Sequence, residues 1–266
     1  MPIHRTAARD ETWPCSIAAL RRGRPSRVAL VSAALLVVLA FSTLAPAQSE
    51  TSPAAQSRTA APAAEATENR WEPSIRRFEE LDRKSPPAPG GIVFVGSSSI
   101  VGWKLDKFFP DLPVVNRGFG GSQLADSVHF ADRIVVPYKP RVVVLYAGDN
   151  DIASGKSPEQ VAADFDAFVA KIRKALPHAK IIFIPIKPSL ARWKLIDKMR
   201  QANALIRRRA TECEGVVVLD IEQPMLGEDG RPRAELFRED GLHLNDAGYR
   251  LWSDLLRPHL EPETTP

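Results

Sequence analysis

Five short apolar runs constrain the fold of this chain more than any other feature of its sequence. The runs are continuous rather than alternating, which is typical of strands buried on both faces of a parallel sheet. They cover residues 91–95, 113–115, 142–146, 181–184 and 216–219. A chain with this pattern is expected to form one parallel sheet.

Segments with helical periodicity separate the later runs. One such segment spans residues 158–176, where the apolar side chains are Val161, Phe165, Phe168, Val169 and Ile172. The next has the same spacing at Leu195, Met199, Ala202 and Ile206. This alternation predicts an α/β fold, a three-layer α/β/α arrangement around a five-stranded parallel sheet with right-handed crossovers. Such a sheet binds ligands beyond the carboxyl ends of its strands, so the residues that follow each run are the candidates for a site.

The first 47 residues have the character of an export signal. Arginines precede residues 28–44, which carry no charge, and Ala45-Pro46-Ala47 has the A-x-A form of a cleavage site. The uncharged segment also approaches the length of a membrane-spanning helix. We expect residues 1–47 to be a signal peptide or an N-terminal membrane anchor that spans through residues 28–44. The body would then be exported, to the periplasm or the extracellular space.

The next segment, residues 48–70, is rich in Ala, Pro, Ser and Thr. Because it offers almost no large apolar side chain to bury, we expect a disordered linker. The remaining residues, 71–266, are of a length typical of one domain.

The charge distribution argues against a nucleic-acid partner. The chain carries a net charge of +4, and its first 27 residues hold six arginines against Asp10 and Glu11. This leader accounts for the whole excess, so the body is electrically balanced and has no predicted nucleic-acid role. The two cysteines do not form a metal-binding pattern, and the sequence predicts no cofactor.

Polar residues follow the first and second runs. The first run leads into Gly96-Ser97-Ser98-Ser99, which places hydroxyl groups at a strand tip. A serine there could be a nucleophile at a helix start or simply a helix cap. The second run leads into a glycine-rich segment, residues 118–122, which could expose backbone N–H groups to an anion or be a flexible turn.

Two further polar segments complete the set. The third run ends in Gly148-Asp149-Asn150-Asp151, where the Asn150 amide could donate to an oxyanion or form an Asx turn. Near the C-terminus, Asp240 precedes His243 by three residues, so its carboxylate could orient the imidazole. Together the four segments supply a nucleophile, a base with its orienting acid, and oxyanion donors, which is the inventory for acyl transfer.

These four segments resemble the SGNH hydrolases, also called GDSL-type esterases and lipases, over about residues 92–256. The chain is most similar to acylhydrolases of the platelet-activating-factor acetylhydrolase type. The resemblance implies a flavodoxin-like α/β/α fold and a triad of Ser98, His243 and Asp240. It also implies an oxyanion hole formed by the backbone of Ser98 and Gly121 and the side chain of Asn150.

One position departs from the family pattern. The first block of the family usually reads Gly-Asp-Ser-Leu or Gly-Asp-Ser-Ile, and here Ser97 stands in the place of the aspartate. Because three serines are consecutive, Ser97 and Ser99 remain alternatives to Ser98 as the nucleophile.

The expected function is a serine esterase that cleaves short acyl esters, with acetyl esters among the candidates, of a small molecule or a glycan. Two alternatives stay open. A metal-dependent phosphoesterase could use Asp149, Asp151, Asp240 and His243 as ligands, and a non-catalytic glycan-binding domain could share the fold. Trp103, Arg117 and residues 187–189 could line the pocket or serve packing alone. The sequence does not reveal the oligomeric state.

Overall fold

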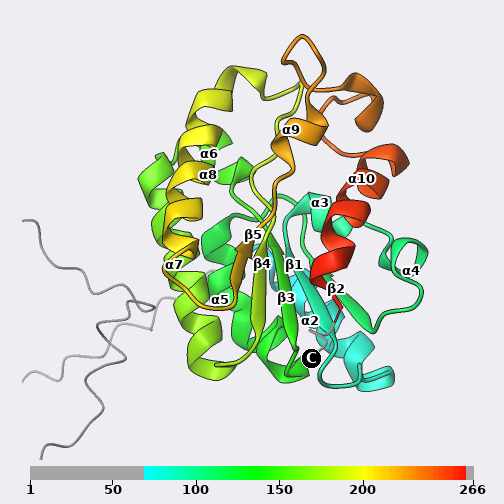
Figure 1. The fold of residues 1–266 in the computed structure, drawn as a ribbon. Coiled ribbons are helices and arrows are strands. Elements are labelled where there is room, and N and C mark those ends of the chain that lie inside the picture. Colours follow the sequence, from blue (N-terminus) through cyan, green and yellow to red (C-terminus); the bar gives the residue numbers. More distant parts are fainter. Residues whose placement is uncertain (1–68, 262–266) are drawn as a thin grey trace, which may run out of the picture. The chain divides into compact units, whose positions relative to one another are not determined.

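Five parallel strands form a single sheet in the order β2-β1-β3-β4-β5 (Figure 1). The structure is a computed structural model that describes residues 69–261. The strands are β1 (Ile92–Gly96), β2 (Val114–Gly118), β3 (Val142–Tyr146), β4 (Lys180–Phe183) and β5 (Val216–Val218). All five predicted runs are therefore strands, and the predicted α/β fold is confirmed. The predicted leader, residues 1–47, and most of the predicted linker lie outside the described residues and stay predictions.

Helices cover both faces of the sheet. On one face lie α2 (Glu72–Lys84), α5 (Leu124–Ile134), α7 (Pro158–Ala175) and α8 (Ile196–Ala210), whose buried side chains pack with Val93, Val95, Val143 and Leu145. On the other face lie α3 (Ser98–Val101), α4 (Leu105–Phe108), α9 (Glu222–Met225) and α10 (Asp246–Leu256), which pack with Ile92, Phe94, Val142 and Val144. One short helix, α6 (Asp149–Ala153), follows β3. Successive residues of a strand therefore point to opposite faces of the sheet and pack in different hydrophobic cores. This follows from the two-residue repeat of a β-strand.

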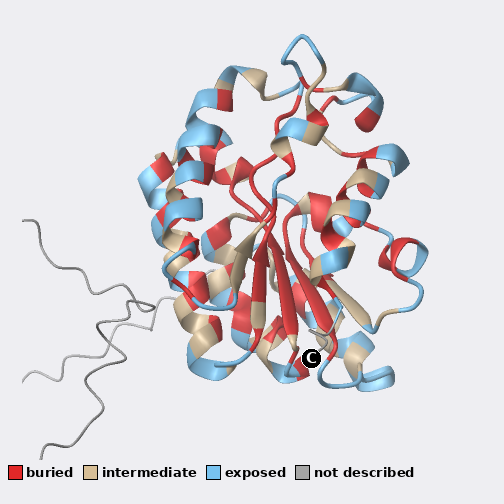
Figure 2. Cartoon of the chain, viewed as in Figure 1, coloured by how far each residue is buried: buried red, intermediate tan, exposed pale blue. Residues whose placement is uncertain are grey.

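Strands β1 and β3 are buried throughout, whereas the two edge strands are not (Figure 2). Val216, Val217 and Val218 of β5 are all half-buried, and so are the first three residues of β2. The expectation that all five strands are buried on both faces is therefore wrong for β2 and β5. Each of them has a neighbouring strand on one side only, so the layers cover it incompletely.

The predicted crossover helix α7 shows how sequence fixes an element. It begins with a capping box in which the Ser157 hydroxyl accepts from the Gln160 backbone N–H and the Gln160 side chain accepts from the Ser157 N–H. Pro158 occupies the first turn, where no backbone donor is needed. All five apolar residues predicted for its inner face are fully buried.

The strand register brings the ends of three strands to one level. Gly96, the last residue of β1, pairs with Gly118 of β2 on one side and with Tyr146 of β3 on the other. The segments that follow these three residues therefore start from the same edge of the sheet. Within residues 69–261, we find no helix with the length and apolar character needed to cross a membrane.

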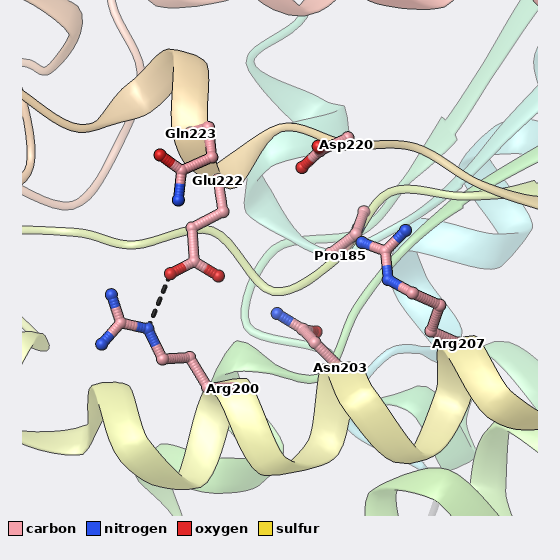
Figure 3. Close-up of a pocket in the computed structure, with 7 residues that line it drawn as sticks. All are labelled: Pro185, Arg200, Asn203, Arg207, Asp220, Glu222 and Gln223. Atoms are coloured by element: carbon pink, nitrogen blue, oxygen red, sulfur yellow. Dashed lines mark hydrogen bonds and ion pairs between the residues drawn. The ribbon is translucent and has the colours of Figure 1, made fainter.

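A cavity of about 370 Å³ lies between α8 and the segment that follows β5 (Figure 3). An ion pair of 2.6 Å joins Arg200 Nε on α8 to Glu222 Oε1 at one side of it. The Asn203 side chain, also on α8, is bonded to both the backbone N–H and the carbonyl of Ile186. The lining of this cavity includes none of the residues of the four predicted segments.

Candidate active site

A close backbone contact sets the turn between β1 and α3. Gly96 has a φ of +136°, and a Cβ atom there would lie 1.9 Å from the carbonyl oxygen of Tyr146. Only glycine fits this position. The turn starts α3 immediately after the strand, with Ser97 at the N-cap position and Ser98 as the first helical residue.

The three consecutive serines have different surroundings. Ser97 is fully buried, and its hydroxyl finds no hydrogen-bond partner within residues 69–261. Ser99 is also buried, and its hydroxyl accepts from Lys187 Nζ at 3.3 Å. Ser98 is half-buried, and it is the serine whose Oγ faces the His243 ring. The capping alternative does not hold, because no serine side chain caps α3.

A tight turn just before α10 presents Asp240 and His243. One carboxylate oxygen of Asp240, Oδ1, accepts from the backbone N–H groups of both Leu242 and His243 at 2.9 Å. The other oxygen, Oδ2, lies 2.6 Å from His243 Nδ1. The turn is followed by Asn245, whose side-chain oxygen caps the N-terminus of α10.

Ser98, His243 and Asp240 form a connected chain of hydrogen bonds. His243 Nε2 lies 3.0 Å from Ser98 Oγ, across 145 positions of sequence. Hydrogen bonds from the His243 ring and from two backbone N–H groups hold the pKa of Asp240 well below its ordinary value. Because this carboxylate is therefore charged and only accepts, Nδ1 must carry the proton of neutral His243, which leaves Nε2 to accept from Ser98.

The glycine-rich segment lies beside the N-terminal edge of the described chain. Gly121 has a φ of +75°, and a Cβ atom there would lie 3.2 Å from the Trp71 ring. Arg70 Nη2 donates to the Gly121 carbonyl oxygen at 3.2 Å. Trp71 also packs edge-on against Phe119, with ring centroids 5.9 Å apart.

Asn150 lies in α6 and reaches toward the same segment. Its Nδ2 donates to the Ser122 carbonyl oxygen at 2.9 Å, and its Oδ1 accepts from Arg192 Nη2 at 3.0 Å. The amide therefore bridges the glycine-rich segment and the segment after β4, and it does not form the Asx turn considered from the sequence. Gly121 and Asn150 both follow strands that end at the same edge of the sheet as β1, which Ser98 follows.

Sequence reasoning missed a group of buried charges next to this site. Asp149 and Lys187, 4% and 1% exposed, form an ion pair of 3.3 Å, and Arg192 Nη1 lies 3.1 Å from the same carboxylate oxygen. Lys187 Nζ also donates to the Tyr146 hydroxyl at 2.9 Å. The available signal was a lysine three residues after the fourth apolar run, where its burial demands a partner.

Other candidate residues serve packing or local structure. Trp103 is buried in an aromatic cluster and donates to Ser253 Oγ at 3.1 Å. Arg117 is buried against Asp82 and Tyr138. Asp151 accepts from the Leu124 backbone N–H, which begins α5, and pairs with Lys156 at 2.9 Å.

The ligands required by the phosphoesterase alternative do not gather into a metal site. Asp149 is paired with Lys187 and Arg192, and Asp151 with Lys156. Across residues 69–261, no group of three or more His, Cys, Asp and Glu side chains is placed to hold a metal ion.

Comparison with known proteins places the chain in a family. Residues 95–251 match the family described as GDSL-like lipase/acylhydrolase. The alpha2 subunit of rat platelet-activating factor acetylhydrolase IB is 28% identical over 194 residues, which cover 68% of this chain and 80% of that protein. The human subunit has the same identity and coverage.

Solved structures share the fold. A GDSL-like lipase from Bacteroides thetaiotaomicron has a TM-score of 0.59 and 20% identity, covering 70% of this chain and 96% of its own. A variant of an acetyl-xylooligosaccharide esterase from Geobacillus has a TM-score of 0.53 and 15% identity, covering 68% and 98%. These likenesses show the fold, and the family match over residues 95–251 leads to one conclusion. The chain belongs to the GDSL-like lipase/acylhydrolase family of SGNH hydrolases and is a hydrolase of ester bonds.

Proposed function

We propose that this protein hydrolyses short acyl esters of small molecules or glycans through an acyl-enzyme on Ser98. The single observation that carries the proposal is the unbroken chain from Ser98 Oγ to His243 Nε2 and from His243 Nδ1 to Asp240, at 3.0 and 2.6 Å. This arrangement suits a nucleophile, a general base and the acid that orients the base.

In the proposed first step, Ser98 Oγ attacks the ester carbonyl carbon while His243 Nε2 takes the hydroxyl proton. The alcohol then leaves with that proton as the carbonyl re-forms on Ser98. Water, activated by His243 in turn, attacks the acyl-enzyme and releases the carboxylic acid. Asp240 remains ionised and stabilises the transient imidazolium.

Three donors are proposed to stabilise the tetrahedral oxygen: the backbone N–H groups of Ser98 and Gly121, and the Asn150 amide. Ser98 is the first residue of α3, where backbone N–H groups lack helical partners. The Asn150 amide has two N–H bonds and donates one of them to Ser122, which leaves the second for an oxyanion.

Short acyl groups are favoured by what is known of the relatives. The rat relative is named as an acetylhydrolase, and the Geobacillus structure as an acetyl-xylooligosaccharide esterase. We propose that acetyl esters are the best substrates of this chain. A comparison of p-nitrophenyl acetate, butyrate and octanoate, together with acetylated sugars, tests this part of the proposal.

Substitution of the proposed residues tests the mechanism. Ser98→Ala should abolish p-nitrophenyl acetate hydrolysis and labelling by a fluorophosphonate, because it removes the nucleophile. Asn150→Ala should lower kcat by about 10²- to 10³-fold, the usual cost of one lost oxyanion donor.

The neighbouring serines provide matched controls. Ser97→Ala and Ser99→Ala remove hydroxyls at adjacent positions, and both variants should still be labelled by the fluorophosphonate. Wild-type hydrolysis by Ser98→Ala, or loss of labelling only in one of the neighbouring variants, would overturn the assignment of Ser98.

A further inference from the structure

The Asn150 amide can be oriented only by its neighbours. A carboxamide has nearly the same shape when it is rotated by 180°, so packing alone does not decide which end carries the N–H groups. Arg192 is a donor only and lies 3.0 Å from one end of the amide, and the Ser122 carbonyl is an acceptor only and lies 2.9 Å from the other. Both neighbours demand the same orientation, with Oδ1 toward Arg192.

Arg192 is itself held by a buried carboxylate. Its Nη1 lies 3.1 Å from Asp149 Oδ2, while its Nη2 donates to Asn150. Burial alone would raise the pKa of Asp149, but the adjacent Lys187 and Arg192 keep that pKa below its ordinary value. Asp149 is therefore an anion that anchors the guanidinium.

Hydrogen bonds connect this buried ion pair to residues beside Ser98. Lys187, the second cation on Asp149, donates to the Ser99 hydroxyl at 3.3 Å and to the Tyr146 hydroxyl at 2.9 Å. Asp149 also directly precedes Asn150 in α6, so one short helix presents both the carboxylate and the amide. Arg192 thus has a fixed position relative to the strand ends.

We propose that Arg192 is a positioning residue for Asn150. It fixes the amide in the orientation that presents Nδ2, and its positive charge on Oδ1 polarises the N–H bonds that would face an oxyanion. This inference rests on the proposed oxyanion role of Asn150, and it assigns to Arg192 no contact with substrate.

The two contacts of Arg192 require the shape of a guanidinium. Its two terminal nitrogens serve Asp149 and Asn150 at the same time, whereas a lysine offers a single point charge on a flexible stem. Arg192→Lys should therefore restore only part of what Arg192→Met loses.

A double-mutant cycle tests the proposal in the full-length chain. Arg192→Met should lower kcat for p-nitrophenyl acetate by about tenfold or more while KM stays within about twofold, because an interaction of the transition state is weakened. In an Asn150→Ala background the same substitution should cause almost no further fall, since its target is gone. Arg200→Met is the matched control: this exposed arginine pairs with Glu222 beside the cavity in Figure 3, and its loss should leave kcat unchanged.

Two outcomes would overturn the proposal. One is a fall in kcat of equal size in the wild-type and Asn150→Ala backgrounds, which would mean that Arg192 acts independently of Asn150. The other is a rise in KM with unchanged kcat, which would indicate direct contact with the substrate. If Arg192→Met fails to fold, as judged by circular dichroism, Arg192→Lys is carried through the same cycle.

A measurement without substrate separates this inference from the proposed function. The side-chain amide signals of Asn150 in a ¹H–¹⁵N spectrum, identified by their absence in Asn150→Ala, should shift in Arg192→Met and not in Arg200→Met. Unshifted signals would refute the positioning role even if Ser98 is the nucleophile. Shifted signals together with an active Ser98→Ala would instead refute the proposed function and retain the contact.

Discussion

The charge state of Asp240 determines how the site should respond to acid. Its pKa is lowered because the His243 ring and two backbone N–H groups donate hydrogen bonds to the carboxylate. A lowered pKa means that the carboxylate stays ionised throughout the range in which a free aspartic acid would take up a proton. Loss of activity in acid should therefore not reflect protonation of Asp240.

We expect Asp240 to add no ionisation to the acid side of the kcat/KM profile. In a plot of log kcat/KM against pH the slope should not exceed one down to about pH 4, because Asp240 stays ionised in that range. Hydrolysis rates of p-nitrophenyl acetate, measured from about pH 4 to about pH 8, provide the test.

The stability of the fold at each pH is checked separately by circular dichroism. A slope approaching two above about pH 4 would show that Asp240 titrates there and would contradict the expectation.

Individual residues were only partly predictable from the sequence. Asp240 and His243 are three positions apart, so their contact follows from local geometry. Which of the three serine hydroxyls faces His243 depends on how α3 starts, and this local geometry is not visible in the residue types. Arg192 was missed because its partners, Asp149 and Asn150, lie more than 40 positions away and become neighbours only when β3 and β4 pair.

At the scale of elements, an arginine on α5 joins that helix to α2. Arg133 Nη1 lies 2.7 Å from Glu72 Oε2, and its Nε lies 2.7 Å from Glu79 Oε1. These hydrogen bonds lower the pKa of both glutamates below the ordinary value of 4.5. A lowered carboxylate pKa stabilises the fold above the ordinary value, and this contribution is lost as the pH falls through the folded-state pKa.

We expect Arg133→Met to lower the free energy of unfolding by about 1 kcal/mol at neutral pH, because solvent screens these half-buried pairs. The difference from the wild type should shrink as the pH falls below the ordinary pKa of the glutamates, because protonation of Glu72 and Glu79 removes their attraction to Arg133. Urea denaturation of both proteins at several pH values measures this difference in the free energy of unfolding.

Arg77→Met provides the control on α2 itself, since Arg77 is exposed on that helix. Its midpoint of unfolding should match the wild type at every pH. A difference for Arg133→Met that stays constant with pH would show that lost packing, rather than the ion pairs, is responsible.

Elements with strong periodicity were predictable, and α2 was not. The five apolar runs and the inner face of α7 are formed almost where their residue patterns indicate. In α2 only Ile75 is fully buried, and its other apolar residues are spread among many charges. Such a helix is stabilised by the partner against which it docks, so its own sequence carries a weak signal.

At the scale of the whole molecule, export stays a prediction of the sequence. The prediction rests on the arginines before residues 28–44 and on the A-x-A segment at residues 45–47. We propose that the protein acts outside the cytoplasm, cleaved after Ala47 or anchored through residues 28–44.

Processing can be tested directly in a bacterial host that expresses the full chain. If the leader is cleaved, the mature protein should begin at Gln48, as read by mass spectrometry of its N-terminal peptide. Ala47→Phe should block cleavage, because the position before the cut requires a small residue, and the uncut protein should then stay with the membrane fraction. An intact N-terminus on protein recovered from the cytosol would contradict export.

The contact between Trp71 and Gly121 has a practical consequence for anyone who shortens this enzyme. The domain boundary suggested by composition falls near residue 71, yet Arg70 holds the Gly121 carbonyl and the Trp71 ring lies against the same glycine. Truncation at Glu72 would keep every residue of the four family segments and still remove the two side chains that support a proposed oxyanion donor. Any trimmed version should therefore begin no later than Asn69.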